Sequence, residues 1–484
     1  MIYSDGDKYT GQWKKDKYNG RGMFSYNNGD KYVGEWKEGK KDGKGLFTWN
    51  DGDRYEGKFK NDLREGTGKM IYKNGDSYNG EWKNDLRNGN GIMNYKDKCS
   101  YNGQWKDGIK NGKGVFIFSN GDKYDGNWVN DKMEGKGILI YKSGGKFDGN
   151  FVNGLKEGKG IMIFASGNKL EIEFKNDTPE GNGIVIFKDG DKYEGDIENE
   201  KIEGNGIMIY KDGDKYEGSF KNGLKDGKGV FIFKNGNKYE GDFQNDKAEG
   251  NGKITFKNGN QYEGEWKNNE RDGKGTFLYA NGDKYEGQFK NGKCEGEGVY
   301  TFKNGDVYNG NWKNDKMNGN GVFAFINGDI YEGNFKDNKM EGNGVYHWKN
   351  GDSYEGDWKN NVRDGNGVMN YNNGNKYNGQ WKNNKKEGKG VLTFSDGEKY
   401  DGNWKDNNKN GMGKYFWKNG DSYEGNWKND LRDGKGVFIW SDGDKYDGEW
   451  KKDMKEGNCV YYDNNEKKSF KEIWKNNEFV QQVS

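Results

Sequence analysis

The chain has 484 residues and balanced charge, with 80 Lys and Arg against 79 Asp and Glu, so it offers no basic excess for nucleic acid phosphates. Its hydrophobic content is only 30%, but its aromatic content of 15% argues against disorder, because disordered segments are poor in aromatic residues. No run approaches the ~20 apolar residues of a membrane span, and residues 1–5 do not begin a signal peptide.

The sequence is a repeat with a period of 23 residues, which runs from Tyr9 to Tyr446 through twenty units without insertion or deletion. Most of the 83 glycines lie two, eleven, thirteen or twenty residues after this tyrosine position. Glycine therefore marks structural positions here and is not low-complexity filler.

Each unit contains two strand-like runs. The first, as in residues 8–14, alternates Tyr, Gly and Trp with polar residues, which predicts a half-buried strand. The second, as in residues 112–118, starts with Gly-x-Gly and ends in β-branched and aromatic residues. Turn formers separate the runs, so each unit is predicted to be a β-hairpin. The expected fold is all-β: an elongated, single-layer antiparallel hairpin meander, solenoid-like, with about forty short strands.

The odd period constrains the turns. All tyrosines stay on one face only if one loop has an odd number of residues or the strand has a bulge. Lys-Asn-Gly suits a three-residue loop with a left-handed glycine. The rings are then expected to lie across the strand glycines, with cross-strand pairs of Lys and Glu on the other face.

The pattern of Tyr78, Gly80 and Trp82 followed by Gly89 and Gly91 resembles the MORN (membrane occupation and recognition nexus) repeat, and it recurs in phase twenty times. The resemblance implies an elongated antiparallel sheet and a scaffold or adaptor role, commonly at cytoskeletal or membrane-associated structures. We expect one continuous array over residues 1–463 and a degenerate cap or tail over residues 464–484.

Among the places that depart from the pattern, two are candidate sites. The eighth and ninth units lose the usual Tyr, Gly and Trp, contain the only proline, and gather acidic residues. One interpretation is sequence drift; the other is a bend or docking point where exposed aliphatic and acidic side chains meet a basic partner. This candidate interaction segment comprises Leu170, Ile172, Phe174, Pro179, Glu194, Asp196, Ile197, Glu198, Glu200 and Glu203.

The second place is the C-terminal segment, where the period lapses. Because open sheet edges pair readily with other chains, this segment is expected to cap the sheet or to join two molecules. The candidate residues for capping or homo-oligomerisation are Phe470, Ile473, Trp474 and Phe479.

No constellation for catalysis is evident. The single histidine, His347, has no partner for a zinc site or a hydrolase triad, and the Gly-x-Gly pairs lack the following helix of a nucleotide site. Cys99, Cys294 and Cys459 are scattered and odd in number, which favours a reducing, intracellular setting over a disulfide framework. We expect no enzyme activity, no cofactor and no metal.

The function expected is a scaffold for protein partners in a cytoskeletal or ciliary assembly, in the cytoplasm. The main alternative is a phosphoinositide-binding membrane adaptor, which the absence of a polybasic patch or amphipathic helix disfavours. An extracellular glycan-binding protein is a further alternative, and nucleic acid binding is not expected.

Overall fold

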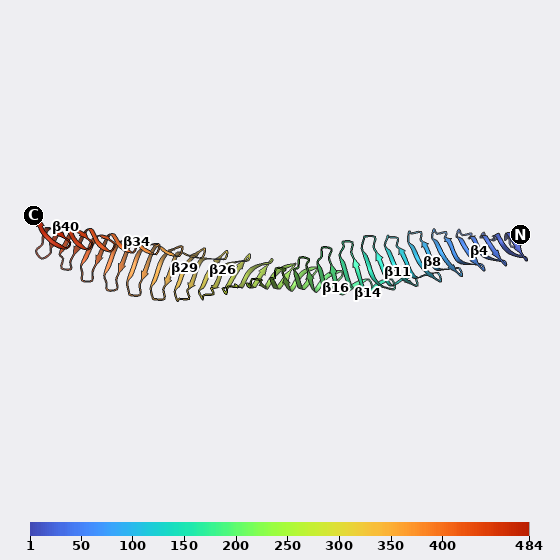
Figure 1. Ribbon diagram of the computed structural model, residues 1–484, viewed down its shortest axis with the longest axis horizontal. Coiled ribbons are helices and arrows are strands. Elements are labelled where there is room, and N and C mark those ends of the chain that lie inside the picture. The colour runs from blue at the N-terminus through green and yellow to red at the C-terminus, as the bar shows by residue number, and fades with distance from the viewer. Residues whose placement is uncertain (484) are drawn as a thin grey trace. The chain divides into compact units, whose positions relative to one another are not determined.

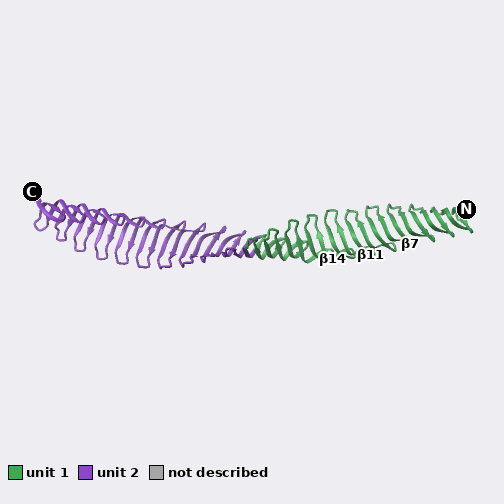
Figure 2. Cartoon of the chain, in the orientation of Figure 1, with its two compact units in different colours: residues 1–236, 243–246 green, residues 237–242, 247–484 purple. Residues whose placement is uncertain are grey.

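The computed structural model describes residues 1–483, and this part of the chain contains no helix. Its 42 strands belong to one antiparallel sheet, and each is hydrogen-bonded edge to edge with its neighbours in a single layer (Figure 1). This confirms the all-β hairpin meander. The contacts divide the chain into two units, Met1–Gly236 with Phe243–Asp246, and Asn237–Asp242 with Lys247–Ser484 (Figure 2).

In the first unit, strands that are consecutive in the sequence pair with one another, and seven-residue strands alternate with nine-residue strands. The strands are β1 (Lys8–Lys14), β2 (Lys17–Ser25), β3 (Lys31–Lys37), β4 (Lys40–Thr48), β5 (Arg54–Lys60), β6 (Leu63–Ile71), β7 (Ser77–Lys83), β8 (Leu86–Asn94), β9 (Ser100–Lys106), β10 (Ile109–Ile117), β11 (Lys123–Val129), β12 (Lys132–Ile140), β13 (Lys146–Val152), β14 (Leu155–Ile163), β15 (Lys169–Lys175), β16 (Thr178–Ile186), β17 (Lys192–Glu198), β18 (Lys201–Ile209), β19 (Lys215–Lys221) and β20 (Leu224–Ile232).

The second unit repeats this arrangement, and β21 (Lys238–Gln244) contains residues of both units. The other strands are β22 (Lys247–Thr255), β23 (Gln261–Lys267), β24 (Glu270–Leu278), β25 (Lys284–Lys290), β26 (Lys293–Thr301), β27 (Val307–Lys313), β28 (Lys316–Ala324), β29 (Ile330–Lys336), β30 (Lys339–His347), β31 (Ser353–Lys359), β32 (Val362–Asn370), β33 (Lys376–Lys382), β34 (Lys385–Thr393), β35 (Lys399–Lys405), β36 (Asn408–Phe416), β37 (Ser422–Lys428), β38 (Leu431–Ile439), β39 (Lys445–Lys451), β40 (Met454–Asp463), β41 (Lys468–Lys475) and β42 (Glu478–Val483).

The turn inside each hairpin has two residues. Between β5 and β6 these are Asn61, with φ of 46°, and Asp62, with φ of 75°. Two consecutive positive φ values match the right-handed strand twist and are typical of a type I′ turn, for which Asn and Asp are suited.

The loop between hairpins is the predicted three-residue loop. Between β6 and β7, the Gly75 N–H donates to the Tyr72 carbonyl at 2.9 Å, and the Tyr72 N–H donates to the Asp76 carbonyl at 2.9 Å. Gly75 has φ of 98°, so it takes the left-handed position of this loop. The odd loop keeps every tyrosine on one face.

Each hairpin also contains a bulge. Opposite the single residue between Gly57 and Phe59, the partner strand has three residues, 65–67. Gly66 in this bulge has φ of 73°, which explains the first glycine of each Gly-x-Gly. The bulge adds two residues and so preserves the alternation of faces.

A single-layer sheet has no second layer to bury its side chains, and here the repeat tyrosine provides the core. Tyr55 is 0% exposed, and its ring lies across Gly57 and Gly68, where an added Cβ would overlap the Tyr55 hydroxyl. That hydroxyl donates to the Lys58 carbonyl at 3.0 Å. The predicted covering of strand glycines by rings is therefore confirmed.

Aromatic contacts link one hairpin to the next on this face, which we call the ring face. The Tyr55 ring contacts Phe59 of its own strand and Trp82 of the next hairpin, with centroid distances of 5.1 and 5.3 Å and edge-to-face geometry. The Trp82 Nε1–H donates to the Gly68 carbonyl at 3.1 Å. Side chains at the turns add further links, since the Arg64 N–H donates to Asp85 Oδ1 at 2.8 Å.

Candidate functional site

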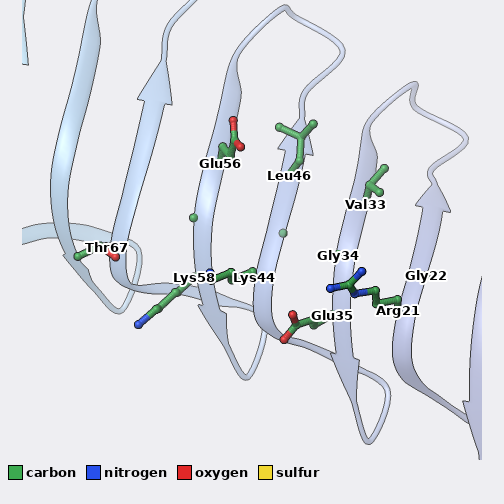
Figure 3. Close-up of a pocket in the computed structure, with 12 residues that line it drawn as sticks. Arg21, Gly22, Val33, Gly34, Glu35, Lys44, Leu46, Glu56, Lys58 and Thr67 are labelled. Atoms are coloured by element: carbon green, nitrogen blue, oxygen red, sulfur yellow. The ribbon is translucent and has the colours of Figure 1, made fainter.

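The face opposite the rings carries shallow grooves that run across the strands. The first groove, of about 650 Å³, crosses β2 to β6. Val33, Leu46 and Glu56 form one side, and a second row that includes Lys44 and Lys58 forms the other (Figure 3). Glycine backbone between the two rows forms the floor, so we call this side of the sheet the groove face.

The same repeat positions line further grooves. In the first unit, a groove of about 600 Å³ crosses β12 to β17, with Ile161, Ile184 and Glu194 on one side and Lys136 and Lys159 on the other. In the second unit, a groove of about 520 Å³ has Asn309, Val322 and Glu332 on one side and Glu297, Asn311 and Asn320 on the other. The framework is constant, whereas the charges and aliphatic residues on it change along the chain.

Ion pairs on the groove face run mainly along single strands. Lys215 and Glu217, two residues apart in β19, are 2.9 Å apart, and seven further pairs within single strands have the same spacing. The predicted ladder of cross-strand pairs is wrong for most of the face, because the register places an aliphatic residue, here Val230, opposite Glu217. Pairs this exposed contribute about 1 kcal/mol or less each.

The apolar members of the candidate interaction segment are buried. Leu170, Ile172, Phe174 and Ile197 are 3–5% exposed, and Pro179 is also buried. The expectation of exposed aliphatic side chains is wrong, because these residues occupy ring-face positions. Leu170 is shorter than the usual tyrosine, so the glycine position beside it can hold a side chain, that of Ile172.

The acidic members of this segment do not form one patch. Asp196 Oδ2 accepts the Asn205 N–H at 2.8 Å, and Glu203 Oε2 accepts the Asn222 N–H at 2.7 Å, so both have structural partners. Glu194 is exposed on the groove face, where it pairs with Lys192 at 3.1 Å. Glu198 and Glu200 are exposed near the turn after β17. A basic partner for these side chains remains a prediction.

The C-terminal candidates lie in one more hairpin. Strand β41 pairs with β40 and places Trp474 opposite Gly457, the position that a repeat tryptophan takes in regular hairpins. Lys455 Nζ lies 4.3 Å from the Trp474 ring centroid. Phe470 and Ile473 are half-buried, whereas Phe479 on the edge strand β42 is 52% exposed.

Deleting residues 464–484 should expose the outer edge of β40 together with the rings that Trp474 covers. We expect the truncated protein to self-associate or precipitate, because an uncovered strand edge pairs with other chains. Light scattering with mass determination before and after deletion measures this. If the truncated protein keeps the oligomeric state and the solubility of the full chain, this hairpin has neither a capping nor an oligomerisation role.

The ring face also carries a row of cations that the sequence patterns above did not predict. The residue nine positions after the tyrosine is often Lys or Arg, and this recurrence could have revealed the row. The Arg64 guanidinium lies 4.3 Å from the Trp82 ring centroid and pairs with Asp85 at 3.0 Å. Lys110 lies 4.6 Å from Trp128, and its burial lowers the pKa of its ammonium.

The reactive side chains stay apart in the fold. Burial raises the pKa of the Cys294 thiol to about 12 and that of Cys459 to about 11, so both are protonated and poorly nucleophilic at neutral pH. His347 is exposed on β30. Within residues 1–483, no three His, Cys, Asp or Glu side chains gather as a metal site, and no helix is long and apolar enough to cross a membrane.

A family model described as the MORN repeat matches twenty consecutive segments, from residues 9–31 to residues 446–467, with the eighth match shortened to residues 173–192. No curated protein matches the chain.

Solved structures show only distant similarity. The TCP domain of Drosophila melanogaster SAS-4, in complex with a proline-rich motif of Ana2, is 15% identical over 40% of this chain and 86% of that chain, with a TM-score of 0.20. The TCP10 domain of Danio rerio CPAP, bound to a STIL peptide, is 12% identical over 55% of this chain and 92% of that chain, with a TM-score of 0.18. A virginiamycin B lyase of Staphylococcus aureus is 14% identical over 66% and 95%, with a TM-score of 0.10. TM-scores of this size carry no functional argument.

Proposed function

Because the chain belongs to the MORN-repeat family, with matches over residues 9–467, we propose that it is a non-enzymatic scaffold for other proteins in a cytoplasmic cytoskeletal or ciliary assembly. MORN repeats are generally protein-interaction modules.

The observation that carries the proposal is the recurrence of the groove. Three grooves of about 650, 600 and 520 Å³ use the same repeat positions with different side chains. A constant framework with varied surface residues supplies several distinct binding surfaces, as extended repeat proteins do for their partners. The shallow, charged lining suits polypeptide surfaces better than a small molecule, which needs an enclosed and mainly apolar pocket.

Proximity labelling in the native cell tests this proposal. We expect the full chain fused to a biotin ligase to label a reproducible set of cytoskeletal or ciliary proteins. Reversing two groove charges with Glu171→Lys and Glu194→Lys should reduce labelling of at least one of them more than tenfold. These side chains are half-buried or exposed, and each loses one ion pair, with Lys169 or Lys192, so the free energy of unfolding should fall by no more than about 2 kcal/mol.

A matched variant, Glu332→Lys, changes the same repeat position in the second unit and should leave that partner's labelling intact. A labelled set identical to that of free biotin ligase would contradict the scaffold function. Purified protein should also fail to sediment with phosphoinositide vesicles at about 0.15 M salt, where weak surface attraction is screened. Strong sedimentation would favour the membrane adaptor.

A further inference from the structure

Two unusual side chains line the first groove, on opposite sides of it (Figure 3). The residue one position after the repeat tyrosine is Asp, Glu, Asn or Thr in nineteen repeats, but in the second repeat it is Val33. The residue three positions after the tyrosine is a cation only in the third repeat, where it is Lys58. The first groove therefore differs in its chemistry from the same positions elsewhere in the array.

Val33 joins neighbouring aliphatic side chains into one surface. It lies directly opposite Met23 on one side and Leu46 on the other, and it is 44% exposed. In the second unit, by contrast, Glu332 separates the valines of the two neighbouring strands. We call the continuous row of Met23, Val33 and Leu46 the apolar rim.

Lys58 creates an unfavourable pair of like charges on the other side of the groove. It lies directly opposite Lys44, and directly opposed like charges destabilise a sheet. At the same repeat positions, Lys113 lies opposite Asn127 and avoids this repulsion. Both Lys44 and Lys58 are exposed. Within residues 1–483 neither belongs to an ion pair, since the ion pairs of β2 to β6 join other side chains. A carboxylate placed between the two lysines would relieve their repulsion.

The groove face is basic over the whole of these five strands. The groove face of β2 to β6 has four carboxylates, which are Glu35, Asp42, Glu56 and Glu65, and ten cations, which are Lys17, Arg21, Lys31, Lys37, Lys40, Lys44, Arg54, Lys58, Lys60 and Lys69. The carboxylates of the adjoining loops and turns have partners of their own, which are backbone N–H groups for Asp30, Asp51, Asp53 and Asp62 and the Lys17 ammonium for Glu38. The local charge therefore fits an acidic partner, although the chain as a whole is nearly neutral.

The width of the groove favours an extended chain. Its two sides are two residues apart along each strand, which is about 7 Å, whereas an α-helix with its side chains is about 10–12 Å across. In an extended chain successive side chains point to opposite sides, so one side can meet the cations and the other the apolar rim. Single-stranded nucleic acid would use aromatic rings for stacking, and the aromatic side chains of β2 to β6 all lie on the ring face.

We propose that the first groove binds an extended, acidic polypeptide segment in which acidic and aliphatic residues alternate. Its carboxylates lie beside Lys44 and Lys58, and its aliphatic side chains pack on the apolar rim. Burial of the aliphatic side chains supplies affinity, while the charges determine orientation and the choice of partner. This inference rests on the proposed scaffold function, for which it names the partner chemistry of one groove.

Binding of a designed peptide to the full chain tests this inference. The probe is a fluorescent seven-residue peptide, Ser-Glu-Val-Glu-Val-Glu-Ser, and fluorescence anisotropy measures its affinity. We expect saturable binding that weakens with salt. Lys44→Gln with Lys58→Gln should weaken binding at least tenfold and reduce its salt dependence. Because Lys58→Gln removes a repulsion, this change alone should not lower the urea midpoint of unfolding, which separates lost binding from lost folding.

Two further variants test the apolar rim and the location of the site. Val33→Glu installs the acidic type of residue that most repeats have at this position, so the fold is kept, and it should weaken binding at least tenfold. Lys389→Gln changes the repeat position of Lys44 in the second unit and should alter the affinity less than twofold.

The inference would be overturned by equal affinity for a peptide with Gln in place of Glu, or for a peptide of the same composition with its Glu and Val residues in two separate blocks. Unchanged affinity in both the double lysine variant and Val33→Glu would also overturn it. Tighter binding of a thymidine oligonucleotide, or sedimentation with vesicles that contain phosphatidylserine, would assign the groove to nucleic acid or to a membrane surface instead. Dimerisation of the chain that Val33→Glu abolishes would assign it to a second copy.

The scaffold function is tested separately from this inference. If the peptide does not bind but proximity labelling still gives a reproducible cytoskeletal or ciliary set, only the inference about the first groove is wrong. If the peptide binds as expected but the labelled set equals that of free biotin ligase, only the scaffold function is contradicted.

Discussion

Gly57→Ile should destabilise its hairpin by about 3 kcal/mol or more, because the new side chain must enter the space that the Tyr55 ring fills. Tyr55 is 0% exposed and its hydroxyl donates to the Lys58 carbonyl, so the ring cannot move aside without losing both burial and a hydrogen bond. Urea unfolding followed by circular dichroism measures the effect.

The eighth repeat shows how the clash is relieved. There Leu170 replaces the tyrosine and Ile172 replaces the glycine, and both are buried. Combining Tyr55→Leu with Gly57→Ile should therefore recover at least half of the lost stability. The reverse cycle applies in the eighth repeat, where Leu170→Tyr alone should destabilise more than Leu170→Tyr with Ile172→Gly. Additive effects of the paired changes would show that ring and glycine position are not coupled.

Alkaline pH should unfold the array abruptly. Burial raises the pKa of the repeat tyrosines, to about 12 for Tyr124 and Tyr308 and further for most others. An unfolded tyrosine ionises near pH 10, so the folded state retains protons that the unfolded state has lost. The contribution of these tyrosines to the free energy of unfolding is fully present below about pH 10. It falls as the pH rises above this value, by up to about 1.4 kcal/mol per tyrosine per pH unit. Because the residue recurs, these losses add.

Simultaneous titrations test this expectation. The β-sheet signal should disappear between about pH 10 and 12, together with a late rise in tyrosinate absorbance. A variant with Tyr124→Phe and Tyr308→Phe should lose stability less steeply with pH, and the seventh repeat already carries a phenylalanine, Phe147, at this position. Full ionisation of the tyrosines near pH 10 with the β-sheet signal intact would contradict the argument.

Local features of the sequence were sufficient for the regular part of the fold. The 23-residue period, the alternation around Tyr9 and the Lys-Asn-Gly loops determined the hairpin, the face of each tyrosine and the three-residue connection. These features depend on backbone geometry within one repeat, since side-chain alternation and the left-handed glycine are short-range properties. The covering of strand glycines by rings followed from the same register.

Packing between neighbouring strands decided the rest. The bulge at residues 65–67 overlaps the Gly-x-Gly run at residues 66–68, and its geometry appears only once both strands are paired. The register placed Val230 opposite Glu217, so Glu217 pairs with Lys215 of its own strand and not with a cation on the neighbouring strand. Ile172 became buried because Leu170 leaves space beside it. The position of a residue within the 23-residue repeat specifies which face of the sheet it lies on. Its burial and hydrogen bonding depend on the neighbouring side chains that share that face.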